Sequence, residues 1–142
     1  MVLNKKLLKL EIDLDFVLIA ITAPLRDYRV AYLINKHLHF NFVRINDHEV
    51  QIYPTSAEPV PFAMFNDFWE ASESDFYLIA NRGTDGMLIP EMREADYFLM
   101  IKNYIDDYDL AEIINGLNRI PEIVAAIKID PKRIKSKENL LF

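Results

Sequence analysis

Residues 16–24 read Phe16-Val17-Leu18-Ile19-Ala20-Ile21-Thr22-Ala23-Pro24, and this stretch decides the fold. Its six consecutive apolar residues are typical of a short strand that is covered on both faces. Pro24 then stands where a helix begins, a position that tolerates the missing N–H of proline. The stretch therefore predicts a buried strand that leads directly into a helix.

The helix predicted after Pro24 runs from Leu25 to about Leu38. At 100° per residue its apolar side chains cover one wide arc, and its basic residues cover the opposite side. One face is therefore expected to be buried and the other to face water. The apolar arc consists of Tyr28, Val30, Ala31, Tyr32, Ile34 and Leu38.

A second helix has the clearest pattern in the chain, because the apolar residues of 110–117 follow the i, i+3, i+4, i+7 spacing. Asp109, followed three residues later by Glu112, has the spacing of a capping box. We therefore expect Asp109 to cap this helix.

Short apolar or alternating segments outside the helices predict strands. Phe62–Trp69 and Phe76–Ala80 are expected to form a β-hairpin, and Asn46-Asp47 a turn between two strands. Prolines 54, 59 and 61 predict an irregular loop. The other predicted strands are 7–13, 16–21, 40–45, 50–53, 97–101 and 123–129.

This order of elements predicts an α+β fold, a two-layer sandwich with a mainly antiparallel sheet and two helices on one face. It can be drawn as a ferredoxin-like split βαβ unit with an inserted β-meander. ACT-type regulatory domains share the order, but no ACT sequence motif is found, so that likeness concerns the fold alone. We expect a single domain over residues 1–130 and a basic C-terminal tail over residues 131–142.

The net charge of −6 argues against nucleic acid as a partner, because phosphates require a basic surface. The tail carries four basic residues and one acidic residue, which leaves 12 basic and 21 acidic residues on the body.

The absence of cysteine excludes disulfides and thiolate zinc sites. No stretch reaches the roughly 18 to 20 apolar residues of a membrane span, and no signal-peptide core forms near the N-terminus. We expect a cytoplasmic protein without a cofactor.

The tail closes on Leu140-Leu141-Phe142. Three apolar side chains are unfavourable in water, because their surface gains free energy on burial. We therefore expect this segment to dock, either within its own chain or across a dimer.

Residues 89–97 read Ile89-Pro90-Glu91-Met92-Arg93-Glu94-Ala95-Asp96-Tyr97. The span resembles the motif of the IPExxxVDY family of small bacterial proteins, with Ala95 in place of the family's Val. The resemblance implies a cytoplasmic protein of the Bacteroidota type. It carries over no catalytic residue, because the family is named for its motif and not for an activity.

Two interpretations of this motif are possible. In the structural one, Ile89 is an anchor, Pro90 stiffens a turn, Glu91 and Asp96 accept backbone N–H groups, and Tyr97 packs inward. In the functional one, Glu91 and Asp96 form a carboxylate pair for a metal or for acid–base chemistry. The structural interpretation is favoured, because no histidine lies nearby in the sequence.

His37 and His39 form an H-x-H pair, and His48 lies nine residues further on. Three histidines can hold a zinc ion with an open position. Nothing in the sequence ties His48 to the pair, so ordinary exposed histidines are favoured. The acidic residues of 106–112 lack the spacing of a calcium loop, and helix capping is favoured for them.

A small ligand would lie near Thr22 and Ala23, where the amides at the start of the first helix point outward. The loop with Arg82 and Gly83 also holds the ingredients of an anion site, but it lacks the spacing of a P-loop. A plain turn is favoured there. No motif of a hydrolase, a zinc protease or a dinucleotide enzyme is found, so we expect a protein that is not an enzyme.

The predicted hairpin carries large apolar groups on both faces, with Phe65 and Trp69 on one of them. Either a helix covers this face, or the hairpin packs against another molecule, which is the favoured alternative.

The preferred hypothesis is a non-enzymatic interaction or scaffold module that acts as a homodimer, with a further protein partner possible. Its expected contact residues are Phe65, Trp69, Leu140, Leu141 and Phe142. The alternatives are a small-ligand-sensing regulatory domain of the ACT kind and a metal-dependent enzyme. The enzyme would use His37, His39 and either Glu91 or Asp96.

Overall fold

Six antiparallel strands form one sheet in the computed structural model, which describes residues 15–52 and 58–142. The strand predicted over 7–13 lies outside the described residues, as does Pro54 of the predicted loop. The order in the sheet is β2-β3-β4-β5-β1-β6. The strands are β1 (Val17–Thr22), β2 (Val43–Val50), β3 (Val60–Trp69), β4 (Ser74–Ala80), β5 (Tyr97–Lys102) and β6 (Ala125–Ile129).

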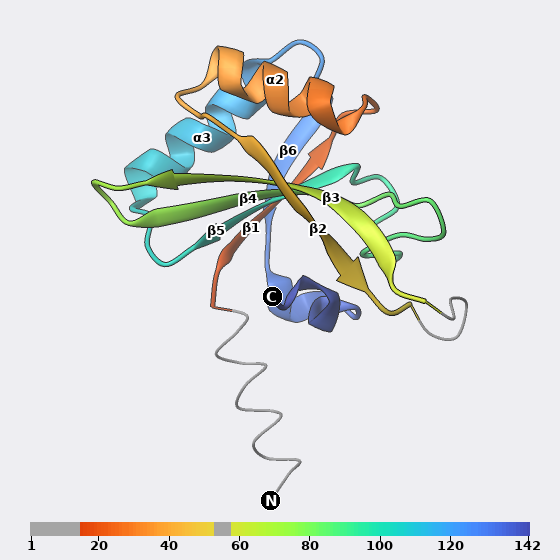
Figure 1. Ribbon diagram of the computed structural model, residues 1–142. Helices are drawn as coiled ribbons and strands as arrows, with labels where there is room; N and C mark the ends of the chain where they lie inside the picture. The colour runs from red at the N-terminus through yellow and green to blue at the C-terminus, as the bar shows by residue number, and fades with distance from the viewer. Residues whose placement is uncertain (1–14, 53–57) are drawn as a thin grey trace, which may run out of the picture.

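The helices are α2 (Asp27–His37) and α3 (Asp107–Arg119), and two short 3-10 turns, η1 (Pro131–Arg133) and η2 (Lys137–Leu140), close the chain. Figure 1 draws both helices above the strands and the C-terminal turns below them. The expectation of an α+β fold with an antiparallel sheet is confirmed. None of the helices in the described part of the chain is long and apolar enough to cross a membrane.

Two buried clusters follow from the alternation of side chains along the strands. One cluster joins the buried side chains of α2 and α3 to a row that crosses the sheet, in which Phe65, Leu78, Leu99 and Ile19 face one another in register. The neighbouring row, Met64, Ile79 and Phe98, belongs to the second cluster. Ile134 and Leu140 of the C-terminal segment join that second cluster. The central strands of the sheet, such as β5, are therefore buried on both faces.

Four local predictions were wrong. Tyr28 and Tyr32, which belong to the predicted apolar arc of the first helix, are 65% and 54% exposed. Pro61, predicted in an irregular loop, lies inside β3 and pairs with Glu49.

Asn46-Asp47 is not a turn but a bulge within the continuous strand β2, where the register with β3 shifts between Ile45 and His48. The long unbroken partner β3 explains the difference, because it supplies ladder hydrogen bonds on both sides of the irregularity. The cap of α3 is Asp106, whose carboxylate accepts the N–H of Asp109 at 2.7 Å, so Asp109 lies inside the first turn.

The hairpin formed by β3 and β4 is confirmed, and its second face is covered by the helices of its own chain. Phe65 is 6% exposed and Trp69 packs against the same cluster as α2 and α3. The covering helix was the less favoured of the two alternatives. The helices cover this face of the hairpin because each of them has an apolar stripe that must be buried against an apolar surface.

Two asparagines, one near the end of each helix, bind the backbone of the following segment: Asn35 binds Phe42, just ahead of β2, and Asn118 binds Ala126, within β6. Asn35 of α2 accepts the N–H of Phe42 at 2.8 Å and donates to its carbonyl at 3.2 Å. Asn118 of α3 makes the same pair of bonds to Ala126, each at 2.9 Å. Because β6 is an edge strand, Asn118 occupies backbone groups that another strand would need for pairing.

Candidate functional site

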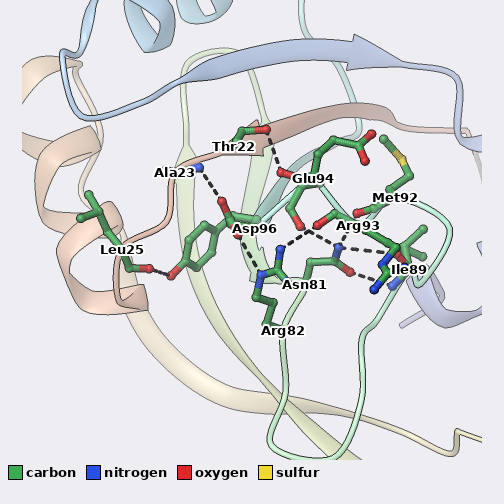
Figure 2. Close-up of polar contacts among 12 residues, drawn as sticks. Thr22, Ala23, Leu25, Asn81, Arg82, Ile89, Met92, Arg93, Glu94 and Asp96 are labelled. Carbon is green, nitrogen blue, oxygen red and sulfur yellow. Dashed lines mark hydrogen bonds and ion pairs between the residues drawn. The ribbon is translucent and has the colours of Figure 1, made fainter.

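The motif of residues 89–97 surrounds a single buried side chain, Asn81, which follows the last residue of β4. The Asn81 amide accepts the N–H of Ile89 at 2.7 Å and donates to the carbonyls of Ala95 at 2.7 Å and Met92 at 3.0 Å. Figure 2 shows these bonds converging on one amide group. Asn81 is 0% exposed, so the loop is folded around it.

Within this loop the chain makes two successive tight turns, closed by the N–H of Met92 on Ile89 and the N–H of Ala95 on Met92. Pro90 occupies the second position of the first turn, where its fixed φ is favoured. These two turns do not continue into a helix. The stiffening role predicted for Pro90 therefore agrees with the geometry.

Asp96 joins three segments that are distant in the sequence. One carboxylate oxygen accepts the N–H of Ala23 at 2.8 Å, and the other accepts Nε of Arg82 at 2.9 Å. The Arg82 guanidinium also donates to the carbonyl of Arg93 at 2.6 Å, and the hydroxyl of Thr22 donates to the carbonyl of Glu94 at 2.9 Å. The sequence-predicted ligand residues Thr22, Ala23 and Arg82 are thus brought together, but their polar groups are engaged internally: Ala23 and Arg82 bind Asp96, and Thr22 binds the carbonyl of Glu94 (Figure 2).

Tyr97 packs inward as predicted, with 5% of its surface exposed, and its hydroxyl donates to the carbonyl of Leu25. Burial, together with the nearby carboxylates of Asp27 and Asp96, raises the pKa of Tyr97 to about 12. The phenol therefore stays protonated and keeps its hydrogen bond to the chain at the start of α2.

Glu91 holds the C-terminal segment. Its carboxylate accepts the N–H of Ser136 at 2.6 Å and the hydroxyl of Ser136 at 2.9 Å. Partial burial by itself would raise the pKa of Glu91, but the hydrogen bonds from Ser136 and from backbone amides outweigh it and lower the pKa. Glu91 and Asp96 are therefore used separately, as acceptors for different backbone segments.

The structural interpretation of the motif agrees with these contacts, and the carboxylate pair of the functional one is not formed. Sequence reasoning missed Asn81, the group that organises the loop. The available signal was a polar amide directly after the buried run 76–80, a place where an unpaired polar group is costly.

The loop with Arg82 and Gly83 is a plain turn, as favoured, closed by the N–H of Gly83 on the carbonyl of Gly86 at 2.8 Å. That N–H is therefore not available to an anion. A Cβ on Gly83 would lie 3.0 Å from the side chains of Phe62 and Val60, so any larger residue here would force these side chains to shift. Beside the loop, a surface hollow of about 470 Å³ lies between residues 24–26 and the side chains of Arg82, Asp96 and Tyr97.

His37 and His39 lie in a different pocket, which we call the Trp69 pocket and which has a volume of about 340 Å³. Residues 37–40, from the last residue of α2 onward, line the pocket together with Trp69 at the end of β3 and one side of α3. The α3 residues are Asp109, Glu112, Ile113, Gly116 and Arg119. The missing side chain of Gly116 lets Leu38 lie against α3, since a Cβ there would come within 3.1 Å of Leu38.

The metal centre considered for His37 and His39 does not form with Glu91 or Asp96. Asp96 binds Ala23 ahead of α2, whereas His37 is the last residue of α2, and an 11-residue helix spans about 16 Å. Across residues 15–52 and 58–142, no three histidine or acidic side chains are grouped closely enough to hold a metal ion.

An aromatic stack forms the wall of the Trp69 pocket. The Trp69 ring stacks on Phe40 with centroids 5.0 Å apart and lies 4.5 Å from the ring of Phe76. Phe40 and Phe76 are buried, whereas Trp69 is half-buried and His37, His39 and Glu112 are exposed. The pocket therefore offers a fixed aromatic surface with ionisable groups at its rim.

Of the C-terminal residues predicted as dimer contacts, Leu140 is buried within the chain, whereas Phe142 stays 46% exposed. Leu140 is 1% exposed in the second cluster, and Leu141 is half-buried. The ring of Phe142 lies 4.9 Å from His48 and 5.0 Å from Tyr77, and Nζ of Lys102 lies 3.9 Å from its centroid. Docking within the chain is therefore observed for Leu140, and a dimer contact through Phe142 stays a prediction.

His48 also fixes this segment, because its Nε2 lies 2.6 Å from the carbonyl of Asn139. Burial lowers the pKa of His48, the hydrogen bond to Asn139 opposes this, and the charge of Lys102 adds to the lowering. Burial, with Asp75 as hydrogen-bond acceptor and neighbouring charge, raises the pKa of Tyr77 to about 12. Both rings next to Phe142 are therefore held in their neutral forms.

No protein-family model, curated protein or solved structure matches this chain. The resemblance to the IPExxxVDY family therefore rests on the residues of the motif alone.

Proposed function

We propose that this protein is a non-enzymatic interaction module that binds a segment of a partner protein in the Trp69 pocket. One observation carries the proposal: three features that are far apart in the sequence, the H-x-H pair, Trp69 and the acidic residues of α3, line one pocket and stay accessible. The polar groups of the motif, by contrast, are engaged in internal hydrogen bonds.

Side-chain docking is favoured over strand addition as the way a partner would bind. Asn118 occupies the backbone of Ala126 on the β6 edge, and the β2 edge is interrupted by its bulge. Bulges and covered edges both oppose edge-to-edge pairing. A homodimer remains our prediction, with contact through side chains such as those of Tyr28 and Tyr32, which are 65% and 54% exposed.

The test is the recovery of partners by chemical cross-linking in the native host, with the wild-type chain and two matched variants. Glu112→Gln removes a charge from the pocket rim, and Glu49→Gln removes an equally exposed carboxylate from β2. We expect one set of cross-linked partners to be lost with Glu112→Gln and retained with Glu49→Gln. Identical partner sets for all three chains would refute the proposal. Native mass spectrometry of the same samples reports whether the chain is a dimer.

A second candidate is the small-ligand sensor, favoured by the hollow of about 470 Å³ beside the start of α2. The Arg82 side chain there is 54% exposed, and Arg26 at the helix cap makes no side-chain capping bond. Asp96 and Tyr97 share the lining, so a ligand would have to match one arginine and one carboxylate. A melting-temperature screen with amino acids and nucleotides, repeated with Arg82→Gln, tests this candidate, and a flat response would remove it.

We further propose the finer fold assignment, a ferredoxin-like or ACT-like order with an inserted β-meander and two helices on one face. The sheet order supports it, because β1 lies between β6 and β5, and β4 and β3 separate β5 from β2. The matching asparagine clamps of α2 and α3 also support two related strand–helix–strand halves. An experimental structure with a topology comparison tests the assignment.

A further inference from the structure

We infer that the Trp69 pocket binds an arginine side chain of the partner segment, an inference that rests on the proposed function. The aromatic surface is the first reason. A guanidinium group stacks on the face of an indole through both cation–π and planar contacts, and tryptophan is the best aromatic partner for a cation. The stack with Phe40 and Phe76 holds Trp69 in a fixed orientation, so little conformational freedom is lost on binding.

The carboxylates of the pocket are the second reason. Among the described residues, neither the Asp109 nor the Glu112 carboxylate has a hydrogen bond or ion pair, whereas Asp27, Asp96 and Glu91 are all bound. The start of α3 favours a negative charge at Asp109, but Glu112 lies further along the helix. Two unpaired carboxylates three residues apart repel each other, and a guanidinium between them would relieve this repulsion.

The positive charge of Arg119 does not oppose such a ligand. Arg119 lies ten residues beyond Asp109, or about 15 Å along α3. Trp69 lies on the hairpin end that contacts the segment ahead of α3. Its pairing partner in β4 is Ser74, and the hydroxyl of Ser74 donates a hydrogen bond to the carbonyl of Tyr104, just ahead of α3. The end of the β3–β4 hairpin that carries Trp69 therefore lies beside the start of α3, where Asp109 is located.

Trp69 is the sole tryptophan of the sequence, so its fluorescence reports on this pocket alone. The probes are the capped tripeptide acetyl-Gly-Arg-Gly-amide and its citrulline analogue, which has nearly the same shape but no charge. We expect a saturable fluorescence change with the arginine peptide, at least about tenfold weaker affinity for the citrulline peptide, and weaker binding at higher salt. Glu112→Gln should lower the affinity several-fold, and Glu49→Gln should leave it unchanged.

Equal affinity for the arginine and citrulline peptides would overturn the inference but leave the pocket as a binding surface. No saturable response to either peptide would also overturn it, whether or not partners are recovered by cross-linking. Identical cross-linked partner sets for the wild-type chain, Glu112→Gln and Glu49→Gln in that separate experiment would instead remove the proposed function itself. Circular dichroism of Glu112→Gln, whose side chain is exposed, verifies that the variant is folded.

Discussion

Asn81→Ala tests whether one buried amide holds the motif loop in place. The substitution leaves the N–H of Ile89 and the carbonyl of Ala95 without a partner, and these two residues are 0% and 1% exposed. An unpaired buried polar group costs about 1–3 kcal/mol, so the two together are expected to lower the free energy of unfolding by about 2–6 kcal/mol. This is a large part of the 5–15 kcal/mol that is typical of a domain.

The assay is urea unfolding followed by Trp69 fluorescence and by far-UV circular dichroism. With an m value of about 2 kcal/mol per molar urea, the unfolding midpoint should fall by about 1–3 M. Asn115→Ala is the matched control, because Asn115 is exposed on α3 and its replacement should change the stability by less than about 0.5 kcal/mol. A loss below about 1 kcal/mol for Asn81→Ala would refute the assignment of Asn81 as the centre of the loop.

Asn81→Asp sharpens the same test through its pH dependence. The ionised carboxylate would keep the bond from Ile89 but face the carbonyl oxygens of Met92 and Ala95. Repulsion and burial would therefore raise the pKa of the introduced group in the folded state. A raised folded-state pKa means that stability is present at low pH and is lost as the pH rises through that pKa. The variant should be more stable, relative to wild type, at pH 3 than at pH 7.

Three further predictions concern the C-terminal segment and the start of α2. Leu140→Ala should cost about 2–5 kcal/mol in urea unfolding, and Leu141→Ala, at a half-buried position, distinctly less. The pKa of Glu91 is lowered in the folded state, so its ionised carboxylate stabilises the fold at pH values above the usual glutamate pKa. This stabilisation is lost as the pH falls through the lowered folded-state pKa, so Glu91→Gln should reduce the acid dependence of the melting temperature. The raised pKa of Tyr97, about 12, predicts stability that falls between pH 10 and pH 12, and Tyr97→Phe should remove part of that fall.

Where a segment's burial is periodic, the sequence predicted its structure well. The run 16–21 became β1, the spacing within 110–117 became the buried stripe of α3, and the hairpin arms became β3 and β4. The turn at Pro90 was predicted for the same reason, because it is closed within four residues. Such features depend on neighbours within a few residues, and the order of residues encodes such neighbours directly. Glu91 and Asp96 accept N–H groups from Ser136 and Ala23, which are 45 and 73 residues away, so the sequence suggested their role as acceptors but not their partners.

The tertiary structure alone decided what covers each apolar face and which polar groups meet. Periodicity shows that Phe65 and Leu140 avoid water, but not that helices of the same chain cover the first and that the second packs under the sheet. Asn81 and the Trp69 pocket depend on segments that the topology of the sheet brings together across many residues of sequence. The physical reason is that hydrophobic burial is non-directional, so a sequence pattern specifies that a side chain is buried without specifying its partner.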